Sequence, residues 1–428
     1  MASTWAKIAE TSGARIYGLA TGVVSLFLTA RMLGPDGRGV VAVILVWVNL
    51  FATFSGLSLG QVAQHVIQCR SKEDWLPSML GFLLPSTLIL TAISYLIGFG
   101  IFKWFGSHLL KDIPPAMIML AFLMLPLLIW EEYSTSMLFS AGCLRAYNIV
   151  QFIARTLSLI SVYVLVKFME FGVAGVILAQ LSGQFIVSVS AFFILWQASG
   201  RRIRFDRKDA VTILKGARFL HFNTIGSFIL ASSTILILNS YVSKAEVGNY
   251  QLAYQMLSVM FIIPQAASMV LFSEMTRIGP DRMWPSQKKI MFQTASVMFV
   301  AGMLAYFFAR PAIYLFAGHK FEQAGMVFQL LLPNLVGLTL AQLMGCQWVG
   351  RGLFIMNAVI TFTFSLLTVA ANLVLIPRFG VQGAIWANWT NYLVLVVLGQ
   401  IVFMAWCEGK WRDLERVEGA KAVPGATA

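Results

Sequence analysis

The sequence predicts an all-α polytopic membrane protein of twelve transmembrane helices, built as two parallel six-helix repeats with both termini in the cytoplasm. Two features of the composition predict the membrane class: 58% of the 428 residues are hydrophobic and only 11% are charged, whereas soluble domains carry about 25% charged residues. Short segments that recur after 208 positions predict that the chain consists of two related halves. The composition excludes an ordinary soluble enzyme, a disordered chain and a coiled coil.

Twelve apolar runs follow one another between polar breaks, and each is close to the roughly 20 residues that a helix needs to cross a bilayer. The first run follows Lys7 and lacks a small-residue cleavage site, so we expect no cleaved signal peptide. The predicted spans are residues 11–31, 39–66, 77–102, 114–140, 146–167, 171–198, 219–243, 248–275, 290–312, 325–350, 353–377 and 381–406.

The longest polar connection lies near the middle of the chain and is rich in arginine. It divides the sequence into an N-terminal six-helix bundle at 1–200, a basic cytoplasmic linker at 201–218, a C-terminal six-helix bundle at 219–406 and a cytoplasmic tail at 407–428. Most other connections are short, which leaves little of the chain for an extramembrane domain.

The distribution of Lys and Arg predicts the orientation, because cytoplasmic loops of membrane proteins carry an excess of both. With the N-terminus inside, the internal segments hold 21 of the 31 basic residues and the external segments hold 9, and Arg155 lies within a span. The formal net charge of +13 therefore reflects topology, and nucleic acid is not expected as a partner.

The four cysteines map to the predicted cytoplasmic ends of spans and form no CxxC pair. They are Cys69, Cys143, Cys346 and Cys407. This spacing favours neither a structural disulfide nor a metal site. We expect no metal and no cofactor.

The two halves share short segments in the same order, at shifts of 207 to 209 positions. The matching pairs are Phe171–Gly175 with Phe379–Gly383, Leu125–Pro126 with Leu332–Pro333, and Gly39 with Gly248. Because each half has an even number of spans, both halves have the same orientation in the membrane. In many secondary transporters such repeats frame a site near the bilayer midplane. A duplication without a transport role is the alternative.

Motifs at helix ends resemble those of a known family. The segments are Thr29–Asp36 with Gly39, Phe54–Ser58, Ala245–Tyr250 with Ala253, and the Phe-Gly-Val-x-Gly element before the sixth and twelfth spans. They are similar to segments of the bacterial polysaccharide and O-antigen flippases of the multidrug/oligosaccharidyl-lipid/polysaccharide exporter superfamily. Two positions depart from the family pattern. Arg38 stands where an aromatic residue is usual, and Asn239 stands where an acidic residue is common.

The resemblance implies a flippase of the bacterial cytoplasmic (inner) membrane. Its expected substrate is a polyprenyl-diphosphate-linked oligosaccharide (an O-antigen, capsule or exopolysaccharide repeat unit), moved from the cytoplasmic to the outer leaflet by alternating access. Expected partners are membrane lipids and the glycan polymerase and export machinery.

Other functions remain alternatives. An ion-coupled drug or small-molecule antiporter of the same superfamily fits the span count, although the deep positions here are basic or amide rather than acidic. A major facilitator would need a Gly-x-x-x-Asp-Arg pattern that the loop Gln68–Ser78 lacks. A membrane-embedded polymerase or ligase would need a large external loop, so we do not expect an enzyme.

Charged residues inside spans are candidates for function, because a charge at the centre of a span costs about 3 kcal/mol on insertion. We expect Arg155 and Arg15 to line the cavity and bind the diphosphate, since a guanidinium stays charged and can bond two oxygens at once. Alternatively, Arg155 snorkels or pairs with Glu131 or Glu132, and Arg15 is an interfacial anchor. The two glutamates are also candidates for ion coupling; adjacent helical positions point about 100° apart, so only one can face a narrow cavity.

Side-chain amides and one histidine at helical spacing are candidates for binding sugar hydroxyls. Trp386 and Trp389, next to the last of these positions, offer flat apolar faces. The alternative is interhelical hydrogen bonding, worth about 0.6 kcal/mol per contact in membranes. The candidates are Gln61 and His65, Gln180 and Gln184, and Asn388 and Asn391.

Overall fold

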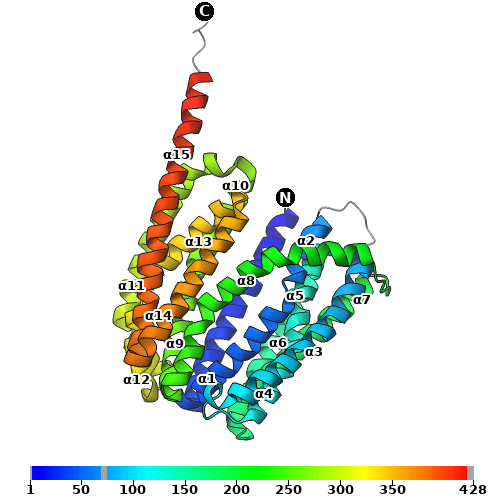
Figure 1. The fold of residues 1–428 in the computed structure, drawn as a ribbon, viewed down its shortest axis with the longest axis vertical. Coiled ribbons are helices and arrows are strands. Elements are labelled where there is room, and N and C mark those ends of the chain that lie inside the picture. The colour runs from blue at the N-terminus through cyan, green and yellow to red at the C-terminus, as the bar shows by residue number, and fades with distance from the viewer. Residues whose placement is uncertain (1, 69–74, 422–428) are drawn as a thin grey trace, which may run out of the picture. The chain divides into compact units, whose positions relative to one another are not determined.

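The computed structural model describes residues 2–68 and 75–421, and every secondary-structure element in these ranges is helical (Figure 1). The elements are α1 (Ala2–Gly56), α2 (Leu59–Gln68), α3 (Trp75–Leu109), α4 (Pro115–Phe122), α5 (Leu125–Ser140), α6 (Leu144–Tyr163), η1 (Val164–Phe168), α7 (Gly172–Ala198), α8 (Arg207–Tyr241), α9 (Lys244–Met260), α10 (Ile262–Ile278), α11 (Pro280–Ala317), η2 (His319–Phe321), α12 (Glu322–Leu331), α13 (Asn334–Gly350), α14 (Phe354–Trp389), η3 (Thr390–Val396) and α15 (Val397–Lys421).

The helices confirm the polytopic membrane class. Within the described ranges, nine helices are long and apolar enough to cross a membrane, and a tenth span forms if η2–α12 and α13, bent by 56°, are taken together. Two of the nine, Ala20–Gly56 and Ile355–Val417, each overlap two of the predicted spans. Counting these as two each gives the twelve spans that the sequence predicts.

Glycine explains why two of the predicted loops shrink to a kink at which one helix ends and the next begins. Gly34 in α1 has φ 69°, and Gly380 in α14 has φ 56°. Glycine reaches positive φ without the steric penalty of a Cβ atom, so the chain turns at one residue and resumes its helix at once. Pro35 follows the first kink directly, where its fixed φ suits the start of a new helix.

Repeat-related positions have the same backbone conformation. Gly172 and Gly380, 208 positions apart, have φ values of 52° and 56°. The Leu-Pro pairs mark the two corresponding breaks, because α5 begins at Leu125 and α13 begins directly after Pro333. The sequence repeat is therefore also a repeat of helix breaks.

The chain forms two compact units, one of Met1–Leu252 with Phe316–Phe321 and the other of Ala253–Leu315 with Glu322–Ala428. In the first unit, α2, α3, α5, α7 and the start of α8 bury a common apolar core. In the second, α10, α11, α13 and α15 do so. The predicted boundaries at 200 and 219 follow the sequence repeat and stay a prediction.

The predicted basic linker is in part helical and packs on the first unit. Asp206 caps α8 by accepting a hydrogen bond from the backbone nitrogen of Lys208 at 2.8 Å. Asp209 is buried and accepts a hydrogen bond from Ser78 on α3 at 2.6 Å. Ile213 is fully buried in the shared core. The start of α8 is thus an amphipathic segment fixed to the bundle.

Gly39 and Gly248, one of the repeat-related pairs, touch each other within the first unit. A Cβ atom on Gly39 would overlap the carbonyl of Lys244, and one on Gly248 would overlap the carbonyl of Pro35. Pro35 and Lys244 are themselves 209 positions apart, so the contact is reciprocal. The close backbone approach requires glycine on both sides.

We predict that Gly39→Ala or Gly248→Ala destabilises the protein by about 1–3 kcal/mol, because the added methyl group meets backbone that cannot move aside cheaply. Unfolding in detergent micelles measures the change. Gly100→Ala is the matched control, since a Cβ atom there meets nothing within 4 Å. Equal stability of all three variants would contradict the close contact.

Candidate functional site

Arg155 lies on α6 with an exposed side chain that reaches α1. Its guanidinium occupies the space that a side chain at Gly18 would fill. The neighbouring contacts fix α6 against α1: the Tyr17 and Thr156 hydroxyls are 2.5 Å apart, and the ring of Tyr17 packs on Phe152 at 4.1 Å between centroids. In the described part of the chain, the structure records no hydrogen bond or ion pair for Arg155.

Arg15 belongs to α1, but its side chain lies outside the described residues. Its position is three residues before Gly18, and positions three apart share one face of a helix. The face of α1 that receives the guanidinium of Arg155 therefore also carries position 15. The shared diphosphate site that the sequence predicts for Arg15 and Arg155 stays a prediction.

Glu131 is held by side chains of two other helices. Its Oε1 accepts hydrogen bonds from Gln151 at 2.9 Å and from Tyr147 at 3.3 Å, both on α6, and its Oε2 accepts one from Gln184 on α7. Its recorded partners are neutral, and Arg155 is not among them. Glu131 therefore joins α5, α6 and α7.

Glu132, the next residue, points elsewhere, as the 100° step of a helix requires. Its Oε2 lies where a side chain at Gly56, the last residue of α1, would have to go. Its Oε1 is buried and has no hydrogen-bond partner in the described ranges. The two glutamates thus differ: one is fully bonded, and the other has an oxygen that is buried and unbonded.

The candidates for sugar binding in the first unit also differ from one another. Gln61 and His65 are both exposed on one face of α2, which agrees with their predicted shared face. Gln180 is half-buried on α7, and no hydrogen bond is recorded for it within the described part. Gln184 is engaged with Glu131 instead of facing an open surface.

In the second unit, Asn388 and Asn391 are both buried. Asn388 donates to the carbonyl of Ala384 in its own helix at 2.8 Å. Asn391 lies in the π-helical segment η3, and both of its amide atoms are buried without a hydrogen-bond partner in the described ranges. π-Helical turns inside helices are frequent at functional sites.

Sequence reasoning missed two groups of polar residues. Asn334 follows the Pro333 break, and both of its amide atoms are buried without a partner in the part that the structure describes. Tyr147 and Gln151, which hold Glu131, are four residues apart on α6. This spacing could have indicated from the sequence that they share one face of the helix.

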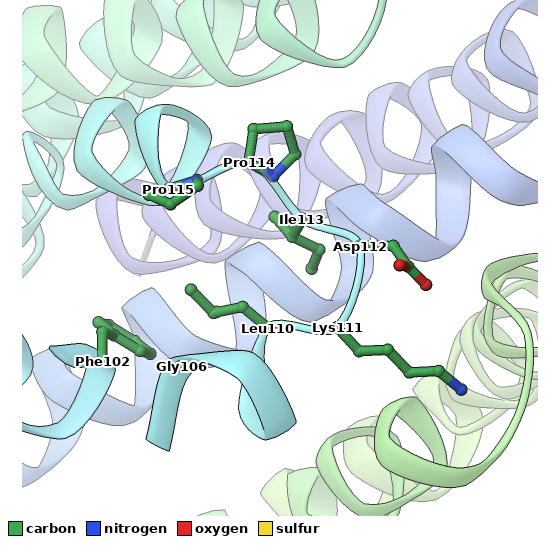
Figure 2. Close-up of a pocket in the computed structure, with 8 residues that line it drawn as sticks. All are labelled: Phe102, Gly106, Leu110, Lys111, Asp112, Ile113, Pro114 and Pro115. Carbon is green, nitrogen blue, oxygen red and sulfur yellow. The ribbon is translucent and has the colours of Figure 1, made fainter. Parts of the chain in front are cut away.

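A cavity of about 480 Å³ opens between the end of α3 and the start of α4. Figure 2 shows its lining, which is mainly apolar, with the side chains of Lys111 and Asp112 directed away from Pro114 and Pro115. Lys111 donates to the carbonyl of Val242 at 3.3 Å. None of the predicted site residues lines this cavity.

The helices define a multi-pass membrane protein with charged side chains inside its spans. The chain belongs to the family described as "Polysaccharide biosynthesis protein", which matches residues 4–278. It is 24% identical over 415 residues to the succinoglycan biosynthesis transport protein ExoT of Rhizobium meliloti (strain 1021), covering 94% of this chain and 79% of that protein. The chain thus belongs to a polysaccharide biosynthesis family and is similar to a transport protein of that process.

Two solved structures share the fold. The inward closed conformation of the lipid II flippase MurJ matches with a TM-score of 0.71 at 15% identity, covering 93% of this chain and 86% of that one. An outward-facing multidrug resistance MATE family transporter of the MOP superfamily matches with a TM-score of 0.64 at 15% identity, covering 94% and 93%. The predicted superfamily fold is confirmed.

We predict that Gln184→Ala destabilises the protein by about 1.5–3 kcal/mol, because it removes a hydrogen bond to a charged acceptor. This exceeds the roughly 0.6 kcal/mol of an average polar contact between membrane helices. Gln180→Ala, four residues earlier on α7, is the control and should change stability by less than about 0.5 kcal/mol. Comparing the unfolding midpoints of the two variants measures the difference. If both variants were equally stable, the role of Gln184 in holding Glu131 would be wrong.

Proposed function

We propose that this protein translocates a polyprenyl-diphosphate-linked oligosaccharide, such as an O-antigen, capsule or exopolysaccharide repeat unit, across the bacterial inner membrane by alternating access. Membership of a polysaccharide biosynthesis family supports the glycan. The relative ExoT is named for succinoglycan transport, and the fold is shared with a lipid II flippase. The lipid-linked substrate class is our inference from these likenesses and from Arg155.

The charged side chain of Arg155, which lies within a span, is the feature that supports this function most directly. Because a charge within a span costs about 3 kcal/mol on insertion, it needs a compensating role. Glu131 does not compensate it, since that carboxylate is bonded to Tyr147, Gln151 and Gln184. A diphosphate supplies the oxygens that a guanidinium binds two at a time. Arg15 would add a second cation on the adjoining face of α1.

The expected orientation gives the transport a direction. With both termini in the cytoplasm, the substrate enters from the cytoplasmic leaflet, where lipid-linked sugars are assembled. An inside-negative potential favours the outward movement of an anion by about 2.3 kcal/mol per charge per 100 mV. Gln61 and His65, exposed on α2, are our candidates for contacts with the sugar, together with Gln180, Asn388 and Asn391. A glycan polymerase and export machinery would receive the product.

An ion-coupled antiporter for small molecules is the second candidate. Glu132 favours it, because this carboxylate has a buried oxygen without a hydrogen-bond partner in the described ranges. The likeness to MATE transporters supports the fold of such an antiporter.

We predict that Arg155→Ala slows the exchange of a fluorescent polyprenyl-diphosphate oligosaccharide between the leaflets of proteoliposomes by tenfold or more. A hydrogen bond to a charged group is worth about 1.5–3 kcal/mol, and 1.4 kcal/mol corresponds to a factor of ten. Arg155→Lys should retain part of the rate, because it keeps the charge but not the two-oxygen geometry.

Lys167→Ala is the matched control for that experiment. Lys167 is exposed in η1, the segment that continues α6, so its removal deletes a charge of the same sign at the end of the same span. It should leave exchange unchanged. Wild-type exchange in the double variant Arg15→Ala/Arg155→Ala would remove the charge argument for this function.

A further inference from the structure

The cavity between α3 and α4 lies where two spans of the first unit end. One span ends at Gly106 and the next begins at Pro115, and the cavity of about 480 Å³ opens between them (Figure 2). Trp104, close to the end of α3, has a side chain that is 78% exposed. Tryptophan is enriched where the hydrocarbon of a bilayer meets the headgroups. The cavity therefore opens at this boundary.

The interior of the cavity suits hydrocarbon and not water. Apolar cavities in proteins stay dry and take up apolar ligands. Gly106 leaves part of the space open, because a Cβ atom there would meet only Phe102, at 3.9 Å. The apolar lining residues are Phe102, Leu110, Ile113, Pro114 and Pro115.

Two lysines give the rim of the cavity a positive charge. Lys111 is part of the lining, and its ammonium group donates to the carbonyl of Val242. Lys244, two residues after Val242, donates to the side chain of Asn239. Lys244 interacts electrostatically with both Lys111 and Asp112. One carboxylate thus accompanies two ammonium groups, which leaves a net charge of about +1 at ordinary pH.

The backbone around the rim is held in place by α8. Asn239 of α8 donates to the carbonyl of Leu109 at 2.9 Å. Asp112 has a φ of 59°, a left-handed conformation that aspartate adopts more readily than most residues. Pro114 and Pro115 then fix the chain before α4, because the proline ring locks φ. A rim that is ordered before a ligand arrives loses less entropy on binding.

We propose that this cavity and its two lysines bind one anionic phospholipid. An acyl chain would enter the apolar cavity, and the phosphate would lie beside Lys111 and Lys244. Lysine binds phosphate as a point charge. A zwitterionic lipid is disfavoured, because its own cationic group would come close to the two lysines. With both termini in the cytoplasm, as we expect, the lipid belongs to the outer leaflet.

This site is separate from the proposed transport function. Arg155 and the other predicted site residues lie on other elements, and none of them lines the cavity. The occupant is a lipid of the surrounding membrane, so the site does not depend on which substrate the protein carries.

Native mass spectrometry of the full-length protein tests the site without any lipid-linked sugar. The protein is purified in detergent and mixed with equal amounts of phosphatidylglycerol and phosphatidylcholine. We expect one phosphatidylglycerol to remain on the wild type at collision energies that remove phosphatidylcholine. Phosphatidylglycerol should also raise the thermal unfolding midpoint, because a ligand of the folded state stabilises it. Inorganic phosphate at the same concentration should not, since it has no acyl chain.

Charge variants test the rim. Lys111→Gln and Lys244→Gln should each weaken the retention of phosphatidylglycerol by about fivefold, the factor that corresponds to roughly 1 kcal/mol for a lysine near anionic lipid. Lys103→Gln is the matched control, because this exposed lysine of α3 lies over the ring of Phe99 and is not part of the lining. It should retain the lipid like the wild type.

A second pair of variants tests the cavity and leaves every charge in place. Gly106→Leu should weaken retention, because the added side chain fills space that the acyl chain needs. Gly100→Leu, on the same helix, is its control, since a Cβ atom at that position meets nothing within 4 Å. This pair also tests the site if either lysine variant does not fold.

The proposal is overturned if the wild type retains both lipids equally, or if Gly106→Leu and Lys111→Gln retain phosphatidylglycerol as well as their controls do. It is also overturned if inorganic phosphate raises the unfolding midpoint as much as the lipid does. Failure of the flipping assay would leave this result unaffected, because no lipid-linked sugar is present here.

Discussion

The constraint on which this structure depends is that hydrocarbon cannot hydrogen-bond to a polypeptide backbone. Every break in a span therefore needs an internal partner or a local conformation that avoids exposing polar groups. At Gly34 and at Gly380 two helices meet at a single non-helical residue, whereas the break at Gly56 receives the hydroxyl of Tyr133. The positions where helices break thus determine where polar side chains must converge.

Much of the fold could be predicted from sequence, because apolar runs and paired motifs report directly on spans and repeats. One match, Gly39 with Gly248, coincides with a close contact between backbones. Another, Phe171–Gly175 with Phe379–Gly383, coincides with a positive φ at the glycine in second position of each segment. The sequence could not show that the turns at Gly34 and Gly380 are kinks and not longer loops, since glycine occurs in both. Tertiary pairing was also beyond sequence reasoning: the 100° step separates Glu131 from Glu132, but it does not say which of them finds partners.

The intramembrane charges of the first unit fall into two kinds. Glu131 is bonded to three neutral side chains and holds helices together. Arg155 and Glu132 lack such partners in the described ranges, and an unbalanced charge in a span is retained only where it has a use. An anionic lipid headgroup is the ligand that we propose for the arginine.

The central claim, that this protein carries an anionic glycolipid, is tested most directly by native mass spectrometry of the protein purified from membranes that make the glycan. We expect a bound polyprenyl-diphosphate oligosaccharide on the wild type and much less of it on Arg155→Ala, with Lys167→Ala like the wild type. Equal retention by all three proteins, or only ordinary phospholipid on the wild type, would contradict the claim.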